Sequence, residues 1–318
     1  MDILITGISK SGKTSIKKVV FEKIPPNETV YNETTENLEI FNVETLGFCK
    51  LNIIEFPSTF KYEKANDEVE KILNKCGSLI FIINSQEKKE VQYEYFKKNI
   101  VQILLKHKNI SLSILIHKND NSNISCNDFN LLKEEIKKRI IQIQKENSLK
   151  DINITFFTTS IYNTSIFEAF SKILQNIIIQ NKNLSILTDE ISKNCKFENA
   201  FLFDVFNKIY LGVNNSSVES SKTYDICTNL IDIVLDMVSI YGDESYNDFD
   251  NNLSCSIKLN DLDNKGNNYS ENIICLKFID FNLALVVIMD EKYYERTNLM
   301  NYNVKIFEEA VKNILNKN

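Results

Sequence analysis

The sequence predicts two domains of different fold class: an α/β domain over residues 1–182 with a doubly wound, mostly parallel sheet, and an α+β domain over residues 183–318 with an antiparallel sheet. The length of 318 residues exceeds the ~100 to 200 residues that one domain usually has. In the first part, short apolar runs alternate with longer amphipathic stretches, which is typical of strands and helices on a parallel sheet. In the second part, apolar runs follow one another across short loops, which favours an antiparallel sheet.

The first part contains five expected strands and five expected helices in alternation. Because parallel strands are joined by crossover helices, the ligand of such a sheet is expected at the carboxyl ends of its strands. We expect strands at residues 3–6, 51–56, 78–84, 113–117 and 152–157, and helices at residues 14–22, 65–75, 91–107, 128–146 and 165–180.

The second part begins after a polar stretch at residues 180–184 and opens with a helix. Residues 264–270 read as a hairpin loop or a short disordered insert. The expected strands are residues 197–205, 208–213, 253–259, 271–279 and 282–289, and the further helices are residues 221–241 and 298–315.

Composition excludes several classes of protein. Hydrophobic residues make up 43% and charged residues 25%, as in folded globular proteins, and the net charge is −6 with no clustered basic face, so nucleic acid is not an expected partner. The seven cysteines have no C-x-x-C spacing and there are two histidines, so no metal or disulfide framework is expected. Without a recognisable signal peptide, membrane span or lipidation motif, we expect a soluble, cytoplasmic protein.

A phosphate-binding motif follows the first expected strand. Gly7-Ile-Ser-Lys-Ser-Gly12-Lys13-Thr14 fits G-x-x-x-x-G-K-[ST] and leads directly into an expected helix. Its glycines let backbone N–H groups surround phosphate oxygens, Lys13 adds positive charge, and the Thr14 hydroxyl can bind Mg²⁺. An ordinary strand-to-helix turn is the alternative.

A base-recognition element follows the strand at residues 113–117. In His117-Lys118-Asn119-Asp120, a carboxylate at Asp120 can accept hydrogen bonds from two guanine donors, which adenine lacks. The segment resembles the N-K-x-D element of regulatory GTPases, and Thr159-Ser160-Ile161 follows the next strand, where GTPases place the loop behind the guanine. A charged surface loop is the alternative.

Longer segments in both parts resemble the Rag GTPases. They are the run from Lys17 to Thr29 with Pro-Pro-Asn-Glu-Thr29, the run from Thr159 to Ser171, Glu198-Asn-Ala-Phe-Leu-Phe-Asp-Val205, and the run from Tyr224 to Gly242. The His at the head of the guanine element indicates the C/D branch.

This resemblance implies a Ras-like GTP-binding domain followed by a roadblock-type dimerisation domain. It further implies GTP or GDP with Mg²⁺ as cofactors and an A/B-type Rag GTPase as heterodimer partner. A lysosomal scaffold complex and a subunit of the TOR kinase complex are the other implied partners. The protein would reach the lysosomal or vacuolar membrane only through partners and would relay amino-acid sufficiency; a nuclear location is a further possibility.

The family's nucleotide-binding residues carry over to matching positions of this chain. Thr35 matches the switch threonine, with Thr34 an adjacent rival, and the expected metal-binding residues are Thr14, Thr35 and Glu55. The expected nucleotide-binding residues are Gly7, Ser9, Lys10, Ser11, Gly12, Lys13, Thr14, Ser15, Thr35, Ser58, His117, Lys118, Asp120, Ser160 and Ile161.

The second switch departs from the family. Where the family has D-F-P-G-Q, this chain has Glu55-Phe56-Pro57-Ser58-Thr59, so Thr59 stands at the position of the glutamine that orients water and no catalytic residue is assigned. The leading hypothesis is a nucleotide-binding signalling subunit with slow hydrolysis. A pseudo-GTPase scaffold with static nucleotide is the alternative, and a P-loop enzyme for a small metabolite is disfavoured because no further acid, base or lid arginine accompanies the loop.

The expected helix at residues 221–241 is apolar over more than one stripe. A helix apolar over most of its circumference is buried on two sides. We expect one side to pack on its own sheet and the other on the partner's dimerisation domain, the alternative being a helix covered within its own domain.

Overall fold

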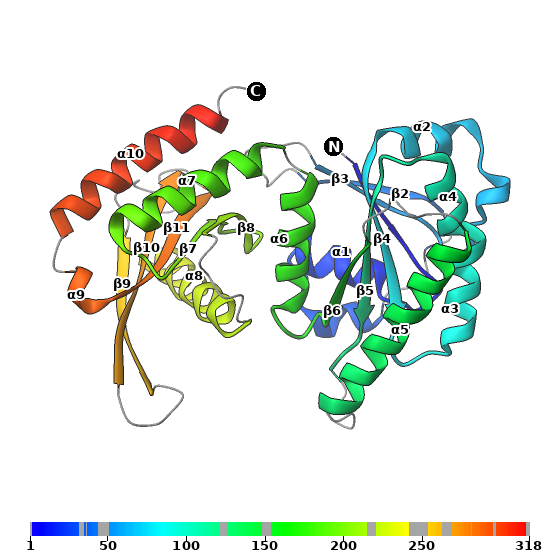
Figure 1. The fold of residues 1–318 in the computed structure, drawn as a ribbon, viewed down its shortest axis with the longest axis horizontal. Coiled ribbons are helices and arrows are strands. Elements are labelled where there is room, and N and C mark those ends of the chain that lie inside the picture. The colour runs from blue at the N-terminus through cyan, green and yellow to red at the C-terminus, as the bar shows by residue number, and fades with distance from the viewer. Residues whose placement is uncertain are drawn as a thin grey trace. The chain divides into compact units, whose positions relative to one another are not determined.

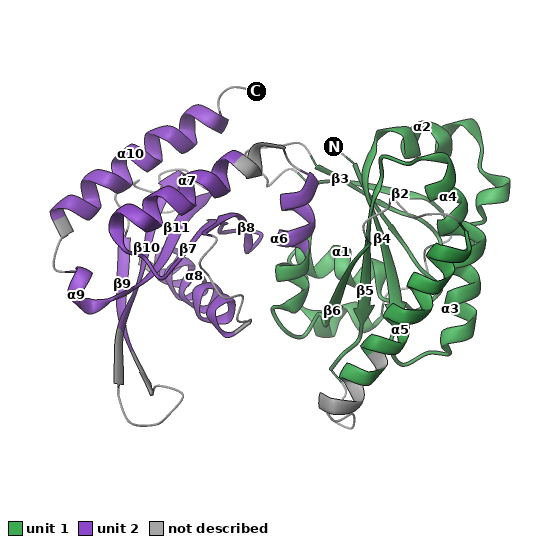
Figure 2. Ribbon diagram, in the orientation of Figure 1, with its two compact units in different colours: residues 1–169 green, residues 170–318 purple. Residues whose placement is uncertain are grey.

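The computed structural model divides into two compact units, residues 1–169 and 170–318 (Figure 2). This division falls within helix α6 (Ser165–Ile177), whereas the expected domain boundary at 182/183 falls within α7 (Ile179–Cys195) and stays a prediction. The structure describes residues 2–31, 35, 37–43, 51–120, 126–147, 154–177, 179–214, 221–241, 254–262, 269–280, 282–294 and 297–315.

The first unit contains a six-stranded sheet in the order β2-β3-β1-β4-β5-β6. Every neighbouring pair is parallel except β2 and β3, which are antiparallel. Strand β4 is buried along its length except at Gly77, as is typical of a parallel strand covered on both faces. The strands are β1 (Asp2–Thr6), β2 (Glu39–Val43), β3 (Leu51–Glu55), β4 (Cys76–Asn84), β5 (Ser111–His117) and β6 (Ile154–Thr159).

Helices cover both faces of this sheet. Figure 1 shows α1 on one side and α2 to α5 on the other, where their apolar residues form one core cluster with alternate strand residues such as Leu4 and Phe81. The helices are α1 (Lys13–Phe21), α2 (Asp67–Lys75), α3 (Lys89–Tyr95), α4 (Val101–Lys106) and α5 (Cys126–Glu146). Short helical turns are η1 (Pro26–Tyr31), η2 (Tyr62–Lys64) and the π-helical η3 (Phe96–Ile100).

The sequence reading missed β2 and the π-helical segment. Strand β2 lies at the edge of the sheet and is mostly exposed, with Ile40 56% exposed, so it lacks the apolar signal of the interior strands. It forms because β3 supplies its backbone partners. Segment η3 breaks the single helix expected at residues 91–107 into α3 and α4.

The second unit contains a five-stranded, fully antiparallel sheet in the order β8-β7-β11-β10-β9. Helix α7 packs against β7 and β8 and lies beside α10, whereas α8 contacts β10 (Figure 1). The elements are β7 (Asn199–Asp204), β8 (Ile209–Val213), α8 (Ser221–Tyr241), β9 (Ser254–Leu262), β10 (Tyr269–Asp280), β11 (Leu283–Asp290), α9 (Glu291–Tyr294) and α10 (Thr297–Leu315).

The predicted fold class is confirmed for both units, since the first sheet is mostly parallel with helices on both faces and the second is antiparallel. The short helix α9 was not expected. Most of the loop expected at residues 264–270 lies outside the described residues.

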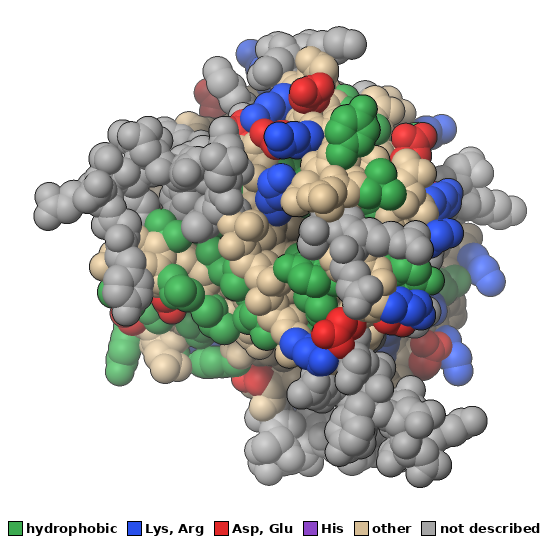
Figure 3. Space-filling view, turned by 90° about the vertical axis from the view of Figure 1, so that its left-hand side faces the viewer, with side chains coloured by type: hydrophobic (Ala, Val, Ile, Leu, Met, Phe, Trp, Pro, Cys, Tyr) green, Lys and Arg blue, Asp and Glu red, His purple; other side chains and the backbone are tan. Residues whose placement is uncertain are grey.

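Charge is mixed on the face of the molecule shown in Figure 3. Among the described residues drawn there, Lys and Arg side chains stand beside Asp, Glu and hydrophobic side chains. The described residues on this face therefore form no basic cluster of the kind that binding to a nucleic-acid backbone requires. Within the described part of the chain, no helix is both long and apolar enough to cross a membrane.

Candidate functional site

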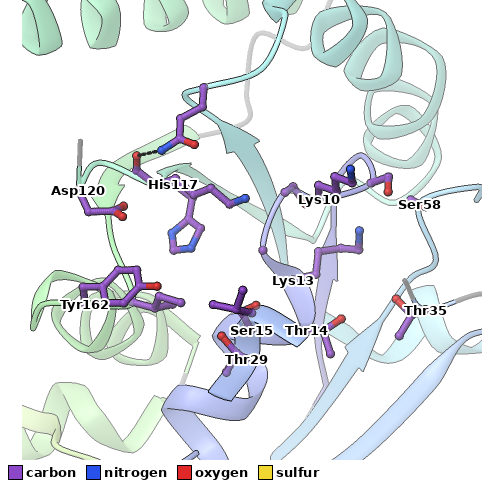
Figure 4. A pocket seen from close by; sticks show the side chains of 17 residues that line it. Lys10, Lys13, Thr14, Ser15, Thr29, Thr35, Ser58, His117, Asp120 and Tyr162 are labelled. Carbon is purple, nitrogen blue, oxygen red and sulfur yellow. Dashed lines mark hydrogen bonds between the residues drawn. The ribbon is translucent and has the colours of Figure 1, made fainter. Parts of the chain in front are cut away.

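A pocket of about 430 Å³ lies at the carboxyl ends of the strands of the first sheet, where a doubly wound sheet binds its ligand. Figure 4 shows Asp120 and Tyr162 at one end, Lys13 and Thr14 at the other, and His117 between them. The lining residues are Ser9, Lys10, Ser11, Gly12, Lys13, Thr14, Ser15, Thr29, Val30, Thr35, Ser58, Gln86, His117, Lys118, Asp120, Ile161 and Tyr162.

The loop between β1 and α1 has the backbone shape that its glycines predict. Gly12 adopts a left-handed conformation with φ of 100° directly before α1, where a side chain would be strained. A Cβ at Gly7 would lie 2.8 Å from the carbonyl oxygen of Ile82, so only glycine fits there without a shift. The first turn of α1 receives no side-chain cap from Gly12, so this helix N-terminus can donate its N–H groups to an anion.

Lys13 lies across this loop and is only 5% exposed. Its Nζ donates hydrogen bonds to the carbonyl oxygens of Gly7 at 3.0 Å and Ile8 at 3.1 Å. Burial lowers the pKa of Lys13, and the negative charge of Glu55 opposes that shift. A buried ammonium held only by carbonyl oxygens is a favourable partner for a phosphate group.

Three oxygen-bearing side chains meet beside Lys13. The hydroxyl groups of Thr14 and Thr35 both donate to Oε1 of the fully buried Glu55, over 2.6 Å and 2.9 Å. Hydroxyl and carboxylate oxygens are the ligand types that Mg²⁺ takes together with nucleotide phosphates, so the residues fit the expected metal. No cluster of three or more His, Cys, Asp and Glu side chains able to hold a metal ion occurs among the described residues.

A buried lysine stands behind this cluster. Lys17 is 6% exposed, and its Nζ lies 2.5 Å from Oε2 of Glu39 and 3.6 Å from Oε2 of Glu55. Burial alone disfavours the charged form, but the hydrogen bond to Glu39 and the charges of Glu55 and Glu39 outweigh it and raise the pKa of Lys17. Lys17 is therefore an ammonium between two carboxylates.

The loop after β5 forms the other end of the pocket. Lys118 has a left-handed backbone with φ of 64°, and its carbonyl oxygen accepts hydrogen bonds from Ser85 Oγ at 3.0 Å and Gln86 Nε2 at 3.4 Å. The backbone N–H of Asn119 donates to the carbonyl oxygen of Thr159 at 3.4 Å. These bonds fix the loop that presents Asp120 to the pocket.

His117 joins the two ends of the pocket. Its Nδ1 lies 3.0 Å from Thr159 Oγ1, and a Cβ at Gly12 would stand 2.7 Å from its Cδ2, so the ring packs closely on the phosphate-side loop. Burial, with a smaller effect of the Lys118 charge, lowers the pKa of His117 to about 4. The ring is therefore neutral at physiological pH.

Most of the predicted site residues line this one pocket, and the others lie beside it. Gly7 and Glu55 do not line it, and Ser160 is buried, with its Oγ accepting from the N–H of Tyr162 at 3.1 Å. Thr59 lines a separate surface hollow with Phe60 and Lys61. Thr34 lies outside the described residues.

Four lining residues were not among the predicted ones: Thr29, Val30, Gln86 and Tyr162. A signal existed for two of them. Thr29 ends the Pro-Pro-Asn-Glu-Thr29 run, and Tyr162 directly follows Thr159-Ser160-Ile161. Gln86 and Val30 have no local pattern that points to a ligand.

Comparison with known proteins agrees with the resemblance found in the sequence. Residues 2–231 match the family model described as the Gtr1/RagA G protein conserved region. The chain is 33% identical to "Ras-related GTP-binding protein D" of Mus musculus, over 97% of this chain and 67% of that protein. It is 32% identical to "Ras-related GTP-binding protein C" of Homo sapiens, over 97% of this chain and 75% of that protein. It is also 32% identical to "GTP-binding protein gtr2" of Schizosaccharomyces pombe, over 98% of this chain and 97% of that protein.

Relatives whose names carry gtr1 or A are more distant, at 22% to 24% identity. The greater identity to the C, D and gtr2 proteins extends over nearly the whole chain. The phosphate-side loop at residues 7–14 and the base-recognition element at residues 117–120 meet at one pocket, as this family requires. Together with the matches, they place the chain in the C/D branch of the Rag GTPase family.

Proposed function

We propose that this protein binds GTP and GDP with Mg²⁺ and acts as the C/D-type subunit of a Rag heterodimer. The observation that supports the proposal is that two groups of residues line one and the same pocket. Gly12, Lys13 and Thr14 lie at its phosphate-side end, and Asp120 lies at its base-side end. Asp120 can accept from the two guanine donors, and Thr14 and Thr35 can bind the metal with Glu55 behind them.

Identifying the bound nucleotide tests this proposal. The purified full-length protein should release guanine nucleotide on denaturation, and unlabelled GTP should displace a fluorescent GDP far better than ATP does. Equal competition by GTP and ATP would contradict guanine recognition. Absence of any bound or bindable nucleotide would contradict the proposal as a whole.

Slow hydrolysis is the second part of the proposal. Ser58 lines the pocket where a glycine would allow closer backbone approach to a phosphate, and Thr59 lies in a different hollow from the pocket. Threonine is also too short to place an amide where a glutamine would orient water. The alternative is a pseudo-GTPase that holds its nucleotide statically and acts mainly as a dimerisation scaffold. Because a static nucleotide is neither exchanged nor hydrolysed, measuring nucleotide exchange and turnover separates the two.

An exposed apolar stripe on α8 supports heterodimer formation. Tyr224, Cys227 and Leu230 are buried in the first half of this helix. Further along the helix, an apolar residue recurs every three or four positions, with Ile233 49%, Met237 53% and Ile240 70% exposed. We propose that this stripe packs on the dimerisation domain of an A/B-type Rag partner, because such a stripe is costly to leave in water.

Replacing Met237 with Asp should weaken this heterodimer by about tenfold or more in Kd, because a buried interface charge without a partner is destabilising. Titration of the full-length protein with an A/B-type partner measures the effect. Leu105→Asp is the matched control, since Leu105 is 42% exposed and belongs to α4 of the other unit. Equal affinity of the Met237→Asp protein and wild type would contradict the assigned surface.

The cellular role rests on family membership alone. We propose that the heterodimer is held on the lysosomal or vacuolar surface by a scaffold complex and relays amino-acid sufficiency to the TOR kinase complex. Depletion of the protein should abolish the response of TOR signalling to amino acids. An unchanged response would restrict the proposal to nucleotide binding and dimerisation.

A further inference from the structure

The buried lysine behind the expected metal site has no role in the function proposed so far. Lys17 lies on α1, one turn beyond Lys13 and Thr14, and is almost fully buried. Its ammonium faces Glu55 of β3 and Glu39 of β2. Lys17 therefore brings a fixed positive charge to the carboxylate of the cluster that fits Mg²⁺.

Glu55 needs such a charge because it is completely buried. Its Oε1 accepts hydrogen bonds from Thr14 and Thr35, whereas its Oε2 makes no hydrogen bond within the described part of the chain and faces Lys17 at 3.6 Å. A buried carboxylate is costly unless it is paired with an opposite charge. Among the described residues, Lys17 is the cation that forms an ion pair with Glu55.

Glu39 holds Lys17 in this position. The contact of 2.5 Å between Lys17 Nζ and Glu39 Oε2 ties α1 to the edge strand β2, and Glu39 is partly exposed while Glu55 is not. The exposed carboxylate is solvated by water as well as by Lys17, so its demand for the ammonium is weaker. The charge of Lys17 thus remains available to Glu55.

We propose that Lys17 is a built-in counter-ion that makes guanine-nucleotide retention in this protein only weakly dependent on Mg²⁺. A bound Mg²⁺ supplies two positive charges to phosphate and carboxylate oxygens. Lys17 already neutralises the carboxylate, and its charge repels a second cation nearby, while Lys13 remains to hold the phosphates. This inference rests on the proposed binding of guanine nucleotide.

The test measures release of fluorescent GDP from the full-length protein in excess Mg²⁺ and in excess EDTA. For wild type we expect EDTA to accelerate release by no more than about threefold. For Lys17→Gln the same ratio should rise by about tenfold or more, because the neutral side chain leaves Glu55 to be balanced by the metal. Lys17→Arg should behave as wild type.

Two variants serve as controls. Lys18→Gln removes the same charge one residue further along α1 and should leave the ratio of release rates unchanged. Glu39→Gln removes the second carboxylate that pairs with Lys17 and leaves the Lys17 ammonium to Glu55. The ratio of GDP release rates in EDTA and in Mg²⁺ should therefore stay low. Thermal unfolding of each variant shows whether it is folded.

Each remaining outcome decides the inference. Strong acceleration by EDTA in wild type would overturn it, and this measurement does not depend on the folding of any variant. Faster release from Lys17→Gln in both Mg²⁺ and EDTA, with an unchanged ratio, would also overturn it. A wild-type protein that binds GDP with full dependence on Mg²⁺ would leave the proposed function intact, whereas failure to bind GDP in Mg²⁺ would overturn both.

Discussion

The two sides of the nucleotide pocket differ in how far they keep the family pattern. The side formed by Gly12, Lys13 and Asp120 has the residues and backbone shape that nucleotide binding requires. The side formed by the second switch, with Ser58 in the pocket and Thr59 outside it, lacks the residues that organise water for hydrolysis. The comparison teaches that the residues proposed for nucleotide binding and those expected to affect hydrolysis belong to separate segments of the chain, so we expect the two properties to change independently.

The largest expected effect is on nucleotide affinity and tests the side of the pocket proposed to bind the base. Asp120→Asn replaces a double acceptor with one donor and one acceptor and leaves a guanine donor unpaired, at a cost of about 1 to 3 kcal/mol in GDP affinity. Xanthosine diphosphate carries a carbonyl where guanine has its amino group, so the affinity of the Asp120→Asn protein for xanthosine diphosphate should rise. Competition of the two nucleotides against fluorescent GDP measures the change.

Asn119→Ala is the control for this substitution, because Asn119 is in the same loop but does not line the pocket. Its affinity for GDP should stay close to that of wild type. If Asp120→Asn also keeps wild-type preference for GDP over xanthosine diphosphate, Asp120 does not read the base.

The next effect concerns the second switch. Ser58→Gly together with Thr59→Gln should raise single-turnover GTP hydrolysis by about tenfold or more, which is ~1.4 kcal/mol of barrier, because it restores close backbone approach and an amide for water. Affinity for GTP should change much less. The assay uses the heterodimer with the phosphate-side loop of the partner disabled.

The single substitutions show which of the two features is limiting. A wild-type rate of ~10⁻⁴ s⁻¹, that of an ordinary Ras-like protein without an activator, would argue against a hydrolysis defect. So would an unchanged rate in the double variant. Either result would remove the contrast between the two sides of the pocket.

The smallest expected effect concerns stability on the binding side. The pKa of His117 is lowered to about 4 from an ordinary value of 6.5, so the unfolded chain binds a proton before the folded protein does. The neutral His117 ring contributes fully to the free energy of unfolding above pH 6.5, and this contribution is lost as the pH falls toward 4. Between pH 7 and pH 5.5 the free energy of unfolding should fall by about 1 kcal/mol from this group.

Urea unfolding of wild type and His117→Asn at both pH values measures this loss. The variant should lose less stability than wild type over the same interval, since it has no ring to protonate. Parallel losses in both proteins would show that His117 does not titrate as a buried group.

The phosphate-side loop and the guanine element could be predicted because each lies within one short segment. Gly12, with its φ of 100°, and Lys13, with its contacts to Gly7 and Ile8, depend on residues no more than six positions away. Spacing along the chain therefore encodes their geometry. The alternation of apolar and amphipathic stretches encodes the interior strands in the same local way.

Other features could not be predicted because their partners lie far along the chain. Spacing alone does not bring Glu55 to Thr14, which lies 41 positions away, and only the family resemblance grouped them; the contact of His117 with Thr159, across 42 positions, was not predicted at all. Strand β2 has little apolar signal of its own and exists because β3 pairs with it. Which apolar residues of α8 stay exposed is visible only once the packing of the unit shows which of them are buried.

The sequence by itself determined the fold class, the phosphate-side loop and the position of Asp120, because local spacing and periodicity specify them. Only the tertiary structure decided that Glu39 of an unpredicted edge strand and Glu55 of β3 enclose the ammonium of Lys17. The physical reason is that a charge becomes influential through burial and proximity, and both are set by packing between segments distant in the chain.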